Sequence, residues 1–338
     1  MRTSVAHPNV LVTLQKPLFD ELSTPEARSK LRKIAGEVAF NDSESPWSQD
    51  DVIPRLRDVH AVISSWGSCL YDERVLQAAP NLQIICYAAG SIRHVTAPAL
   101  FERGIKVTHA AQVIAESVAE HTLAVVLHLL RRIHEFDAAI RAGGWREIVG
   151  AHGRELYGKR YGIVGASMVG RSLIPLLRPF GVRIFVYDPY LSEDHARELG
   201  VEKSDIPELM RSSDVISLHA PILPETKHMI SRDLVRSIKD DAVFVNNARS
   251  WLIDMDALLE ELQKERFDAA LDVFDQEPLP TDSPFHRLKR TILSPHVAGT
   301  TVESRSRLVG AMVGELERFI HNKPLLYEVT PARLQTMH

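Results

Sequence analysis

One stretch of the chain, residues 161–188, restricts the possible folds more than any other. Residues 161–164 form a short apolar run, as expected for a strand of a parallel sheet that is covered on both faces. Gly165 follows this strand, Gly170 lies in the first turn of a helical pattern, and a second apolar strand ends at Asp188. This order is typical of a dinucleotide-binding unit, in which a helix N-terminus binds pyrophosphate and the acid binds the adenosine ribose. The alternative is an ordinary strand–helix–strand unit that binds no nucleotide.

The glycine pattern departs from the fingerprint at Ser167, where a second glycine would let the backbone approach the pyrophosphate. Serine is the smallest residue that can replace this glycine, and its hydroxyl can donate to a phosphate oxygen. Asp188 indicates which cofactor is bound, because a carboxylate accepts from the 2′-hydroxyl of NAD and repels the 2′-phosphate of NADP. Residues 189–191 are Pro, Tyr and Leu and offer no cation for that phosphate. The sequence therefore predicts NAD.

Short apolar strand patterns recur before and after this unit. They lie at residues 9–14, 59–64, 82–88 and 105–108, and then at 215–218, 242–245, 269–273 and 291–293. Helical patterns separate them; the longest covers residues 115–142, and the last begins at a capping box at 300–303. This alternation predicts an α/β fold with two Rossmann-like or flavodoxin-like domains, each built on a parallel sheet.

The composition excludes several classes of protein. A chain of 338 residues is long enough for two domains with their own cores, and a formal net charge of −4 gives no basic surface for nucleic acid. The two cysteines, Cys69 and Cys86, suit a reducing cytosol better than a disulfide framework. The N-terminus has no secretory signal, and the longest apolar run, 123–130, is too short to span a bilayer. We therefore expect a cytoplasmic protein without a membrane or nucleic-acid partner.

Polar and ionisable side chains follow the predicted strands of the second half. They are His219-Ala220-Pro221, Asn246-Asn247-Ala248-Arg249, Asp272 and His296. Binding sites of α/β proteins open at the carboxyl edge of the sheet, so these groups are expected to gather around one site. His121 and His128 lie seven residues apart on the long helical pattern, which is not the four-residue spacing of a helical metal pair. We predict no metal site.

Three segments, 247–249, 271–278 and 295–299, resemble the D-isomer-specific 2-hydroxyacid dehydrogenases. Segments 117–120, 187–189 and 217–221 are also similar to that family, and the resemblance extends from about residue 59 to residue 324. It implies a nucleotide domain, residues 113–300, inserted into a substrate domain made of residues 1–112 and 301–338. It also implies a homodimer that packs through the nucleotide domain.

The chemistry of this family can be matched to residue types. Moving a hydride between nicotinamide and the C2 atom of a 2-oxo acid requires a proton donor for the carbonyl oxygen and a cation for the carboxylate. His296 is the candidate acid and base, because imidazole titrates near neutrality. Glu277 resembles the family carboxylate that orients the ring and favours its protonated form. Arg249 offers a planar fork to the substrate carboxylate and can polarise the carbonyl.

Each of these residues alone has an ordinary structural explanation, but the three together at matching positions favour a catalytic site. Asp272 resembles the family residue that faces the nicotinamide carboxamide, and His219 is assigned to the cofactor side because no carboxylate partner matches it. The residues expected to bind NAD are Gly165, Ser167, Met168, Val169, Gly170, Asp188, His219, Ala220, Pro221, Thr226, Asn247, Ala248, Arg249, Asp272, His296 and Gly299. Those expected to bind the substrate, a small 2-hydroxy or 2-oxo acid, are Ala89, Gly90, Ser91, Arg249 and His296.

Two positions depart from the family pattern. Ser250-Trp251 follows Arg249 where the family has glycine, and Arg249 would be angled differently if that glycine's freedom is needed. Arg93 stands where the family often has an acid; it either points to solvent or favours a substrate with a second anionic group. Glu277 argues against formate dehydrogenase, which pairs its histidine with glutamine. The remaining alternative function is an NAD-sensing binding protein, like the corepressors of the same family, without significant turnover.

Overall fold

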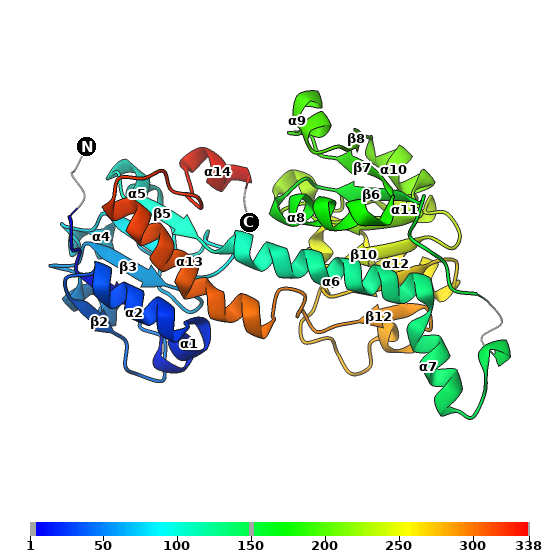
Figure 1. Ribbon diagram of the computed structural model, residues 1–338, viewed down its shortest axis with the longest axis horizontal. Helices are drawn as coiled ribbons and strands as arrows, with labels where there is room; N and C mark the ends of the chain where they lie inside the picture. Colours follow the sequence, from blue (N-terminus) through cyan, green and yellow to red (C-terminus); the bar gives the residue numbers. More distant parts are fainter. Residues whose placement is uncertain (1–4, 149–151, 337–338) are drawn as a thin grey trace. The chain divides into compact units, whose positions relative to one another are not determined.

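The computed structural model describes residues 5–148 and 152–336, which form two compact units. Unit 1 consists of Met1–Ile114 and Thr300–His338, and unit 2 consists of Ala115–Gly299. Each unit is built on a parallel sheet with helices on both faces, which confirms the predicted α/β fold class (Figure 1). Unit 1 is therefore assembled from both ends of the chain, and unit 2 from its middle.

The sheet of unit 1 has five parallel strands in the order β2-β1-β3-β4-β5. The strands are β1 Val10–Val12, β2 Val38–Phe40, β3 Ala61–Ser64, β4 Ile84–Tyr87 and β5 Lys106–His109. Side chains alternate between the faces, and both faces are buried. One face packs against α1 (Lys16–Leu22), α2 (Pro25–Ile34) and α13 (Val302–Ile320). The other packs against α3 (Gln49–Val52), η1 (Ile53–Arg55), α4 (Glu73–Gln77), α5 (Pro98–Glu102) and α14 (Pro331–Thr336).

The sheet of unit 2 has seven parallel strands in the order β12-β11-β10-β9-β6-β7-β8. The strands are β6 Arg160–Val164, β7 Arg183–Tyr187, β8 Glu202–Lys203, β9 Val215–Leu218, β10 Val243–Asn246, β11 Asp268–Leu271 and β12 Thr291–Leu293. One face packs against α6 (Ala111–Arg131), α8 (Met168–Leu177) and α9 (Glu193–Glu198). The other packs against α10 (Ile206–Ser212), α11 (Arg232–Arg236) and α12 (Met255–Gln263). The remaining helical segments are α7 (Ile133–Arg141), η2 (Arg146–Ile148), η3 (Arg178–Phe180), η4 (Pro224–Thr226), η5 (Ser250–Leu252) and η6 (Pro284–Arg287).

The single helix predicted over residues 115–142 is wrong at its centre. Arg132 adopts a left-handed conformation with φ 53°, which ends α6 and starts α7 in a new direction. Its Nε atom donates to Glu135 Oε1 at 2.9 Å, and this contact holds the start of α7. At the other end of the chain, α13 starts after Thr301, one residue later than the predicted cap, and Thr301 accepts from Ser304 N.

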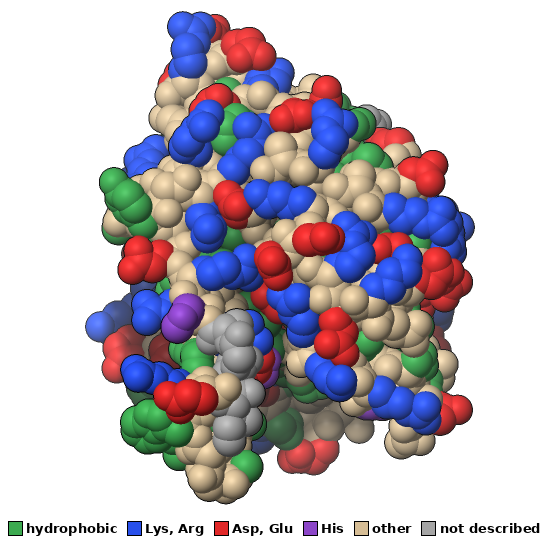
Figure 2. All heavy atoms as spheres, turned by 90° about the vertical axis from the view of Figure 1, so that its right-hand side faces the viewer, with side chains coloured by type: hydrophobic (Ala, Val, Ile, Leu, Met, Phe, Trp, Pro, Cys, Tyr) green, Lys and Arg blue, Asp and Glu red, His purple; other side chains and the backbone are tan. Residues whose placement is uncertain are grey.

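By length and composition alone α6 could cross a membrane, but 56% of its most apolar 18-residue stretch is buried inside the protein. Val126, Leu129 and Leu130 of this helix belong to the core that covers one face of the unit 2 sheet. Such burial is typical of a core helix. Lysine and arginine side chains are interspersed with acidic ones over the described part of the face drawn in Figure 2.

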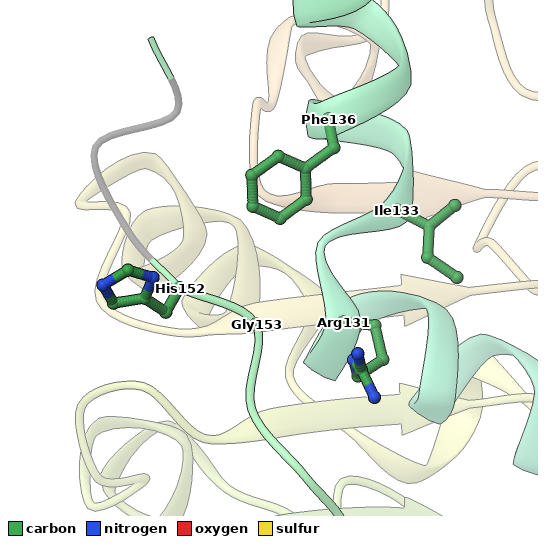
Figure 3. Close-up of a pocket in the computed structure, with 5 residues that line it drawn as sticks. All are labelled: Arg131, Ile133, Phe136, His152 and Gly153. Atoms are coloured by element: carbon green, nitrogen blue, oxygen red, sulfur yellow. The ribbon is translucent and has the colours of Figure 1, made fainter. Parts of the chain in front are cut away.

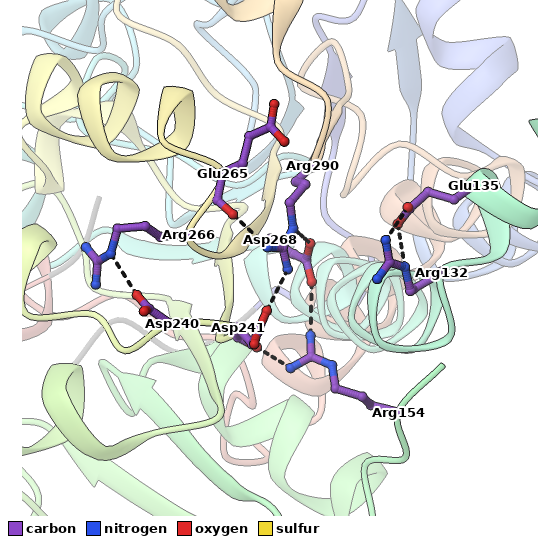
Figure 4. A network of polar contacts seen from close by, with 9 residues as sticks. All are labelled: Arg132, Glu135, Arg154, Asp240, Asp241, Glu265, Arg266, Asp268 and Arg290. Carbon is purple, nitrogen blue, oxygen red and sulfur yellow. Dashed lines mark hydrogen bonds and ion pairs between the residues drawn. The ribbon is translucent and has the colours of Figure 1, made fainter. Parts of the chain in front are cut away.

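Ion pairs close the amino edge of the unit 2 sheet (Figure 4). Asp268 begins β11 and is 6% exposed, and its carboxylate accepts from Arg290 Nε at 2.8 Å and from Arg154 Nη2 at 3.0 Å. Arg290 also contacts Asp241 Oδ1 at 3.1 Å. Every charge of this group has a partner of opposite sign, so we assign it a structural role. The opposite edge, where the strands end, is where the candidate site lies.

Candidate active site

The strands of unit 2 end side by side, and the predicted site residues follow those ends. The pairing register aligns Val164 with Tyr187 and with Leu218, Leu218 with Asn246, and Asn246 with Leu271. Leu271 is in turn aligned with Leu293 of β12. The residues placed directly after these ends are Gly165, Asp188, His219, Asn247, Asp272 and the segment that carries His296. Parallel pairing thus brings segments more than a hundred residues apart in sequence to one edge of the sheet.

The glycine turn after β6 is tightly packed against the end of β9. Gly165 has φ 97°, and a Cβ atom there would lie 2.6 Å from Ala220 N. A Cβ atom on Gly170 would lie 2.4 Å from Gly165 O, so the first turn of α8 can approach the strand only because this residue is glycine. Met168 and Val169, which lie between the two glycines, begin the first turn of α8. This is the cradle that the fingerprint predicts.

Ser167 occupies the N-cap position of α8 but does not cap it. Its side chain accepts no bond from the helix, and its buried Oγ atom has no partner among the residues that the structure describes. Buried polar groups are usually paired, so this hydroxyl fits a phosphate oxygen as its missing partner. The helix N-terminus adds further unpaired N–H groups and a favourable dipole for an anion.

Asp188 is held in a fixed orientation at the end of β7. Its Oδ2 atom accepts from Ala166 N at 2.7 Å and its Oδ1 atom accepts from Tyr190 N at 2.8 Å. Each carboxylate oxygen can accept a second bond, which leaves room for the ribose hydroxyls. No lysine or arginine forms an ion pair with Asp188 within residues 5–148 and 152–336. The carboxylate and its surroundings therefore fit NAD rather than NADP.

Two more buried polar atoms at the strand ends lack partners in the described part of the chain, namely His219 Nδ1 and Asn247 Oδ1. His219 Nε2 lies 2.9 Å from Ser217 Oγ, and burial lowers the pKa of His219 to about 3. The ring is therefore neutral near neutral pH. Asn247 Nδ2 donates to Thr122 Oγ1 at 3.1 Å, so its oxygen is the end left for a donor on a ligand.

The side-chain hydroxyl of Thr226 forms hydrogen bonds within the turn that follows β9. Its Oγ1 atom accepts from Leu223 N at 2.9 Å and lies 2.8 Å from Pro221 O, to which it donates. Thr226 is among the residues expected to bind the cofactor, and in the structure its hydroxyl holds the turn that contains Pro221 and Leu223. Any role toward the cofactor is therefore indirect or uses a remaining lone pair of the oxygen.

His296 and Glu277, which are predicted to act as an acid–base pair, lie in contact. His296 Nδ1 lies 2.7 Å from Glu277 Oε2, and Glu277 Oε1 accepts from Phe274 N at 3.0 Å. Burial opposes ionisation of Glu277, but the hydrogen bonds from His296 and Phe274, together with the charges of His296 and Arg249, outweigh it and hold the pKa of Glu277 below its usual value. Because the carboxylate accepts from Nδ1, Nε2 is the ring nitrogen left for a substrate. His296 itself has φ 55°, a conformation that the surrounding loop must enforce.

Asp272 provides that enforcement. It is 1% exposed, and its Oδ1 atom accepts from Ser294 Oγ at 2.5 Å and from Val297 N at 2.9 Å. Its Oδ2 atom accepts from Ala298 N at 2.9 Å. One buried carboxylate thus accepts three hydrogen bonds and anchors residues on both sides of His296. Sequence reasoning missed this contact, although a serine two residues before the histidine and an acid after the neighbouring strand were visible signals.

Arg249 follows β10 in a segment held by Asn246, whose Nδ2 atom donates to Arg249 O at 3.0 Å and whose Oδ1 atom accepts from Ala248 N at 3.1 Å. The guanidinium donates from Nη1 to Ala248 O at 2.6 Å. Burial lowers the pKa of Arg249, and the charges of Glu277 and Asp272 oppose that effect. Ser250 does not adopt a positive φ, so the missing glycine imposes no strain on this backbone. The Trp251 Nε1–H donates to Leu223 O at 3.1 Å.

The segment predicted to bind the substrate carboxylate lies in unit 1. Ala89, Gly90 and Ser91 follow the carboxyl end of β4 after one intervening residue, Ala88, and Ala89 is buried while the other two are partly exposed. Arg93 is exposed at the same edge. The neighbouring His94 has its Nε2 atom 3.2 Å from Tyr87 Oη.

Two further features of the described residues bear on ligand binding. Among the residues that the structure describes, no cluster of histidine, cysteine, aspartate and glutamate could hold a metal ion. A surface hollow is lined by Arg131, Ile133, Phe136, His152 and Gly153, at the junction of α6 and α7 (Figure 3). None of the predicted site residues lines it.

Comparison with known proteins gives a consistent result. The family model described as "D-isomer specific 2-hydroxyacid dehydrogenase, NAD binding domain" matches residues 123–298. The chain is 33% identical to a glyoxylate reductase of Thermofilum pendens over 88% of this chain and 91% of that protein. It is 33% identical to a D-3-phosphoglycerate dehydrogenase of Methanocaldococcus jannaschii over 84% of this chain but only 54% of that protein. The chain belongs to the D-isomer-specific 2-hydroxyacid dehydrogenase family.

Solved structures agree with this family assignment. A phosphoglycerate oxidoreductase from Rhizobium etli superposes with a TM-score of 0.83 at 27% identity, covering 96% of this chain and 99% of that one. For a 2-hydroxyacid dehydrogenase the cofactor is a nicotinamide dinucleotide, and the unit 2 edge fits it. The close packing at Gly165 and Gly170, the unpartnered Ser167 hydroxyl and the oriented Asp188 carboxylate are groups whose chemistry fits a pyrophosphate and a ribose.

Proposed function

We propose that this chain is an NAD-dependent oxidoreductase that interconverts a 2-oxo acid and the corresponding D-2-hydroxy acid. The observation that carries the proposal is the bond of 2.7 Å between His296 Nδ1 and Glu277 Oε2. A histidine whose second nitrogen is held by a carboxylate is suited to give and take a proton repeatedly near neutral pH. When bound, the nicotinamide supplies or accepts the hydride at its C4 atom.

The protein groups divide the remaining work. His296 donates a proton from Nε2 to the carbonyl oxygen during reduction and removes it during oxidation. Glu277 stabilises the protonated ring, since its carboxylate stays ionised well into the acid range. Arg249 binds the substrate carboxylate and polarises the carbonyl. The family pattern also assigns Ala89, Gly90 and Ser91 to substrate binding.

Cofactor contacts follow from the unpaired groups. Ser167 Oγ and the N-terminus of α8, with Gly165, Met168, Val169 and Gly170, would bind the pyrophosphate. Asp188 would bind the adenosine ribose, while His219 Nδ1 and Asn247 Oδ1 would accept from donors on the cofactor. The other residues assigned to the same site by the family pattern are Ala220, Pro221, Thr226, Ala248, Arg249, Asp272, His296 and Gly299.

We further propose that the enzyme works in the cytoplasm as a homodimer that packs through unit 2. Supporting this, unit 2 exposes large apolar side chains along α7 and just after it, with Ile133 51%, Ile140 52% and Trp145 64% exposed. Exposed apolar groups of this size are typical of surfaces that are covered by a partner.

A panel of 2-oxo acids with NADH tests the activity. Glyoxylate is the first choice because the glyoxylate reductase of Thermofilum pendens matches this chain over nearly its whole length. Hydroxypyruvate, pyruvate, phosphohydroxypyruvate and bulkier acids complete the panel. Loss of NADH absorbance with at least one acid is the expected result. Tight NADH binding without turnover of any acid would instead indicate an NAD-sensing protein.

A further inference from the structure

The segment of unit 1 that is proposed to bind the substrate, residues 89–91, is hydrogen-bonded to the end of the neighbouring strand β5. His109, the last residue of β5, is 2% exposed, and its Nδ1 atom lies 3.1 Å from Gly90 O. A carbonyl oxygen can only accept, so Nδ1 carries the proton and donates it. Burial lowers the pKa of His109 and outweighs the hydrogen bond to Gly90, which raises it; the charge of Arg333 lowers it further. The ring is therefore neutral near neutral pH and keeps one N–H on this carbonyl.

The preceding carbonyl group of the segment, that of Ala89, is also hydrogen-bonded, in this case to a backbone N–H group. Ala110 N donates to Ala89 O at 3.0 Å and also to Tyr87 O at 3.0 Å. The backbone N–H of His109 donates to Tyr327 O at 3.2 Å, which fixes the residue that makes the other contact. His109, the last residue of β5, and Ala110, which follows it, thus fix two consecutive carbonyl groups, those of Gly90 and Ala89.

Fixing these carbonyl groups determines where the N–H groups point. In a trans peptide the C=O and N–H bonds point in opposite directions, and the carbonyls of Ala89 and Gly90 share their peptides with the N–H groups of Gly90 and Ser91. Both N–H groups are therefore turned away from β5, and neither has an acceptor among the described residues. A Cβ atom on Gly90 would meet only Ile114 Cδ1, at 3.5 Å, so the space beside the loop is open. Successive N–H groups with this arrangement form an anion-binding nest.

We propose that His109 is a positioning residue for substrate binding, which acts through Gly90 to hold two backbone N–H groups toward the carboxylate of the 2-oxo acid. This inference rests on the proposed function, since the nest is assigned to the substrate carboxylate. His109 touches neither substrate nor cofactor in this account. Its loss should weaken carboxylate binding and leave cofactor binding and the rate of the chemical step nearly unchanged.

Three substitutions separate the hydrogen bond from the packing of the ring. His109→Leu removes the donor and keeps a buried apolar side chain. His109→Asn places an amide nitrogen about where Nδ1 lies and so retains a donor, whereas His109→Gln carries its amide nitrogen one bond further out. A matched control is His60→Leu, because His60 Nδ1 accepts from Asn9 N at 3.1 Å in the same unit but away from the substrate segment.

The measurements are KM and kcat for the best 2-oxo acid, the Kd of NADH, and the Kd of oxamate for the enzyme–NADH complex. His109→Leu and His109→Gln should raise KM and the oxamate Kd by roughly three- to tenfold, the range expected for one lost hydrogen bond. In both variants kcat and the NADH Kd should change by less than about twofold, as should every parameter of His109→Asn and of His60→Leu.

Several outcomes overturn the proposal. One is a His109→Leu enzyme with wild-type KM and oxamate affinity, and another is a His109→Asn enzyme as impaired as His109→Leu. If His109→Leu fails to fold, the comparison of His109→Asn with His109→Gln decides, and equal oxamate affinities refute the role. A wild-type protein that neither turns over a 2-oxo acid nor binds oxamate refutes the proposed function and this role with it. Turnover that is indifferent to His109 refutes only the positioning role.

Discussion

Asp272→Asn is the substitution that most sharply tests how the active-site loop is held. The two backbone donors of the loop contact different oxygens of this carboxylate, Val297 N on Oδ1 and Ala298 N on Oδ2. An asparagine has a single acceptor oxygen, so only one of the two N–H groups can keep its partner, whereas the Ser294 hydroxyl, which also donates to Oδ1, can rotate and accept from the new amide. The lower-energy arrangement leaves the oxygen on Ala298, which is 2% exposed, and turns the amide NH₂ toward Val297, which is 37% exposed. Val297 directly follows His296, so the loss falls on the catalytic histidine.

The expected magnitude follows from that single lost contact. A hydrogen bond to a charged group contributes about 1.5–3 kcal/mol, and the variant also brings two N–H donors together. Taking about 2 kcal/mol as the cost of holding His296 in its left-handed conformation, the population of the competent loop falls about 30-fold, because each 1.4 kcal/mol is a factor of about ten. We expect kcat/KM for the 2-oxo acid to fall by a similar factor.

Steady-state kinetics and calorimetric NADH binding provide the assay, with Asp275→Asn as the control. Asp275 lies on the same segment but is exposed. The loop-anchor account predicts a large loss in kcat with a nearly unchanged NADH Kd, whereas a role limited to the nicotinamide carboxamide predicts weaker NADH binding. An Asp272→Asn enzyme with kcat/KM within about twofold of wild type would refute the reasoning.

Four further predictions concern the cofactor and the reacting groups. Because Asp188 has its carboxylate oriented by Ala166 N and Tyr190 N, NAD should be preferred over NADP in kcat/KM, and Asp188→Ala should reduce that preference; equal values in the wild type would contradict it. Arg249→Lys keeps the charge but loses the fork, so kcat and KM should both worsen, and wild-type kinetics would remove Arg249 from the site. Glu277→Gln should lower the pH at which reduction fails, since the protonated imidazole loses its counter-charge, and an unchanged pH–rate profile would count against the pair. The pKa of Glu277 is held below 4.5, so the stability that it contributes is present above that pH and is lost as the pH falls below it; the difference in unfolding free energy between wild type and Glu277→Gln should shrink there.

Local sequence patterns were sufficient for most of the fold. The strand–glycine–helix–strand order of residues 161–188 predicted β6, α8 and β7, and short apolar runs predicted the other central strands. The patterns failed where no local signal exists. β2 (Val38–Phe40) lies at the sheet edge with partly exposed side chains, and the break between α6 and α7 occurs at an arginine rather than at glycine or proline. Both depend on tertiary packing, which residue propensity does not reveal.

For the site, the positions of the residues could be predicted from local patterns, whereas the contacts that orient them could not. Gly165, Asp188, Asn247 and His296 could be placed because each follows a strand, and the carboxyl ends of parallel strands meet at one edge. The contacts that fix their orientation could not. Asp272 anchors residues more than twenty positions later through the pairing of β11 with β12, and His109 reaches Gly90 through the pairing of β4 with β5. Such contacts are set by strand register, which the sequence of one loop does not contain.

Transfer of deuterium to glyoxylate from NADH that carries deuterium at both C4 positions, followed by mass spectrometry of the product, tests the central claim most directly. Direct hydride transfer predicts glycolate that carries one deuterium atom. His296→Ala should abolish most of this transfer while NADH still binds, because the carbonyl oxygen loses its proton donor. If glyoxylate proves a poor substrate, the most active acid of the panel replaces it. Undeuterated product, or a His296→Ala enzyme that transfers deuterium at the wild-type rate, would contradict the account.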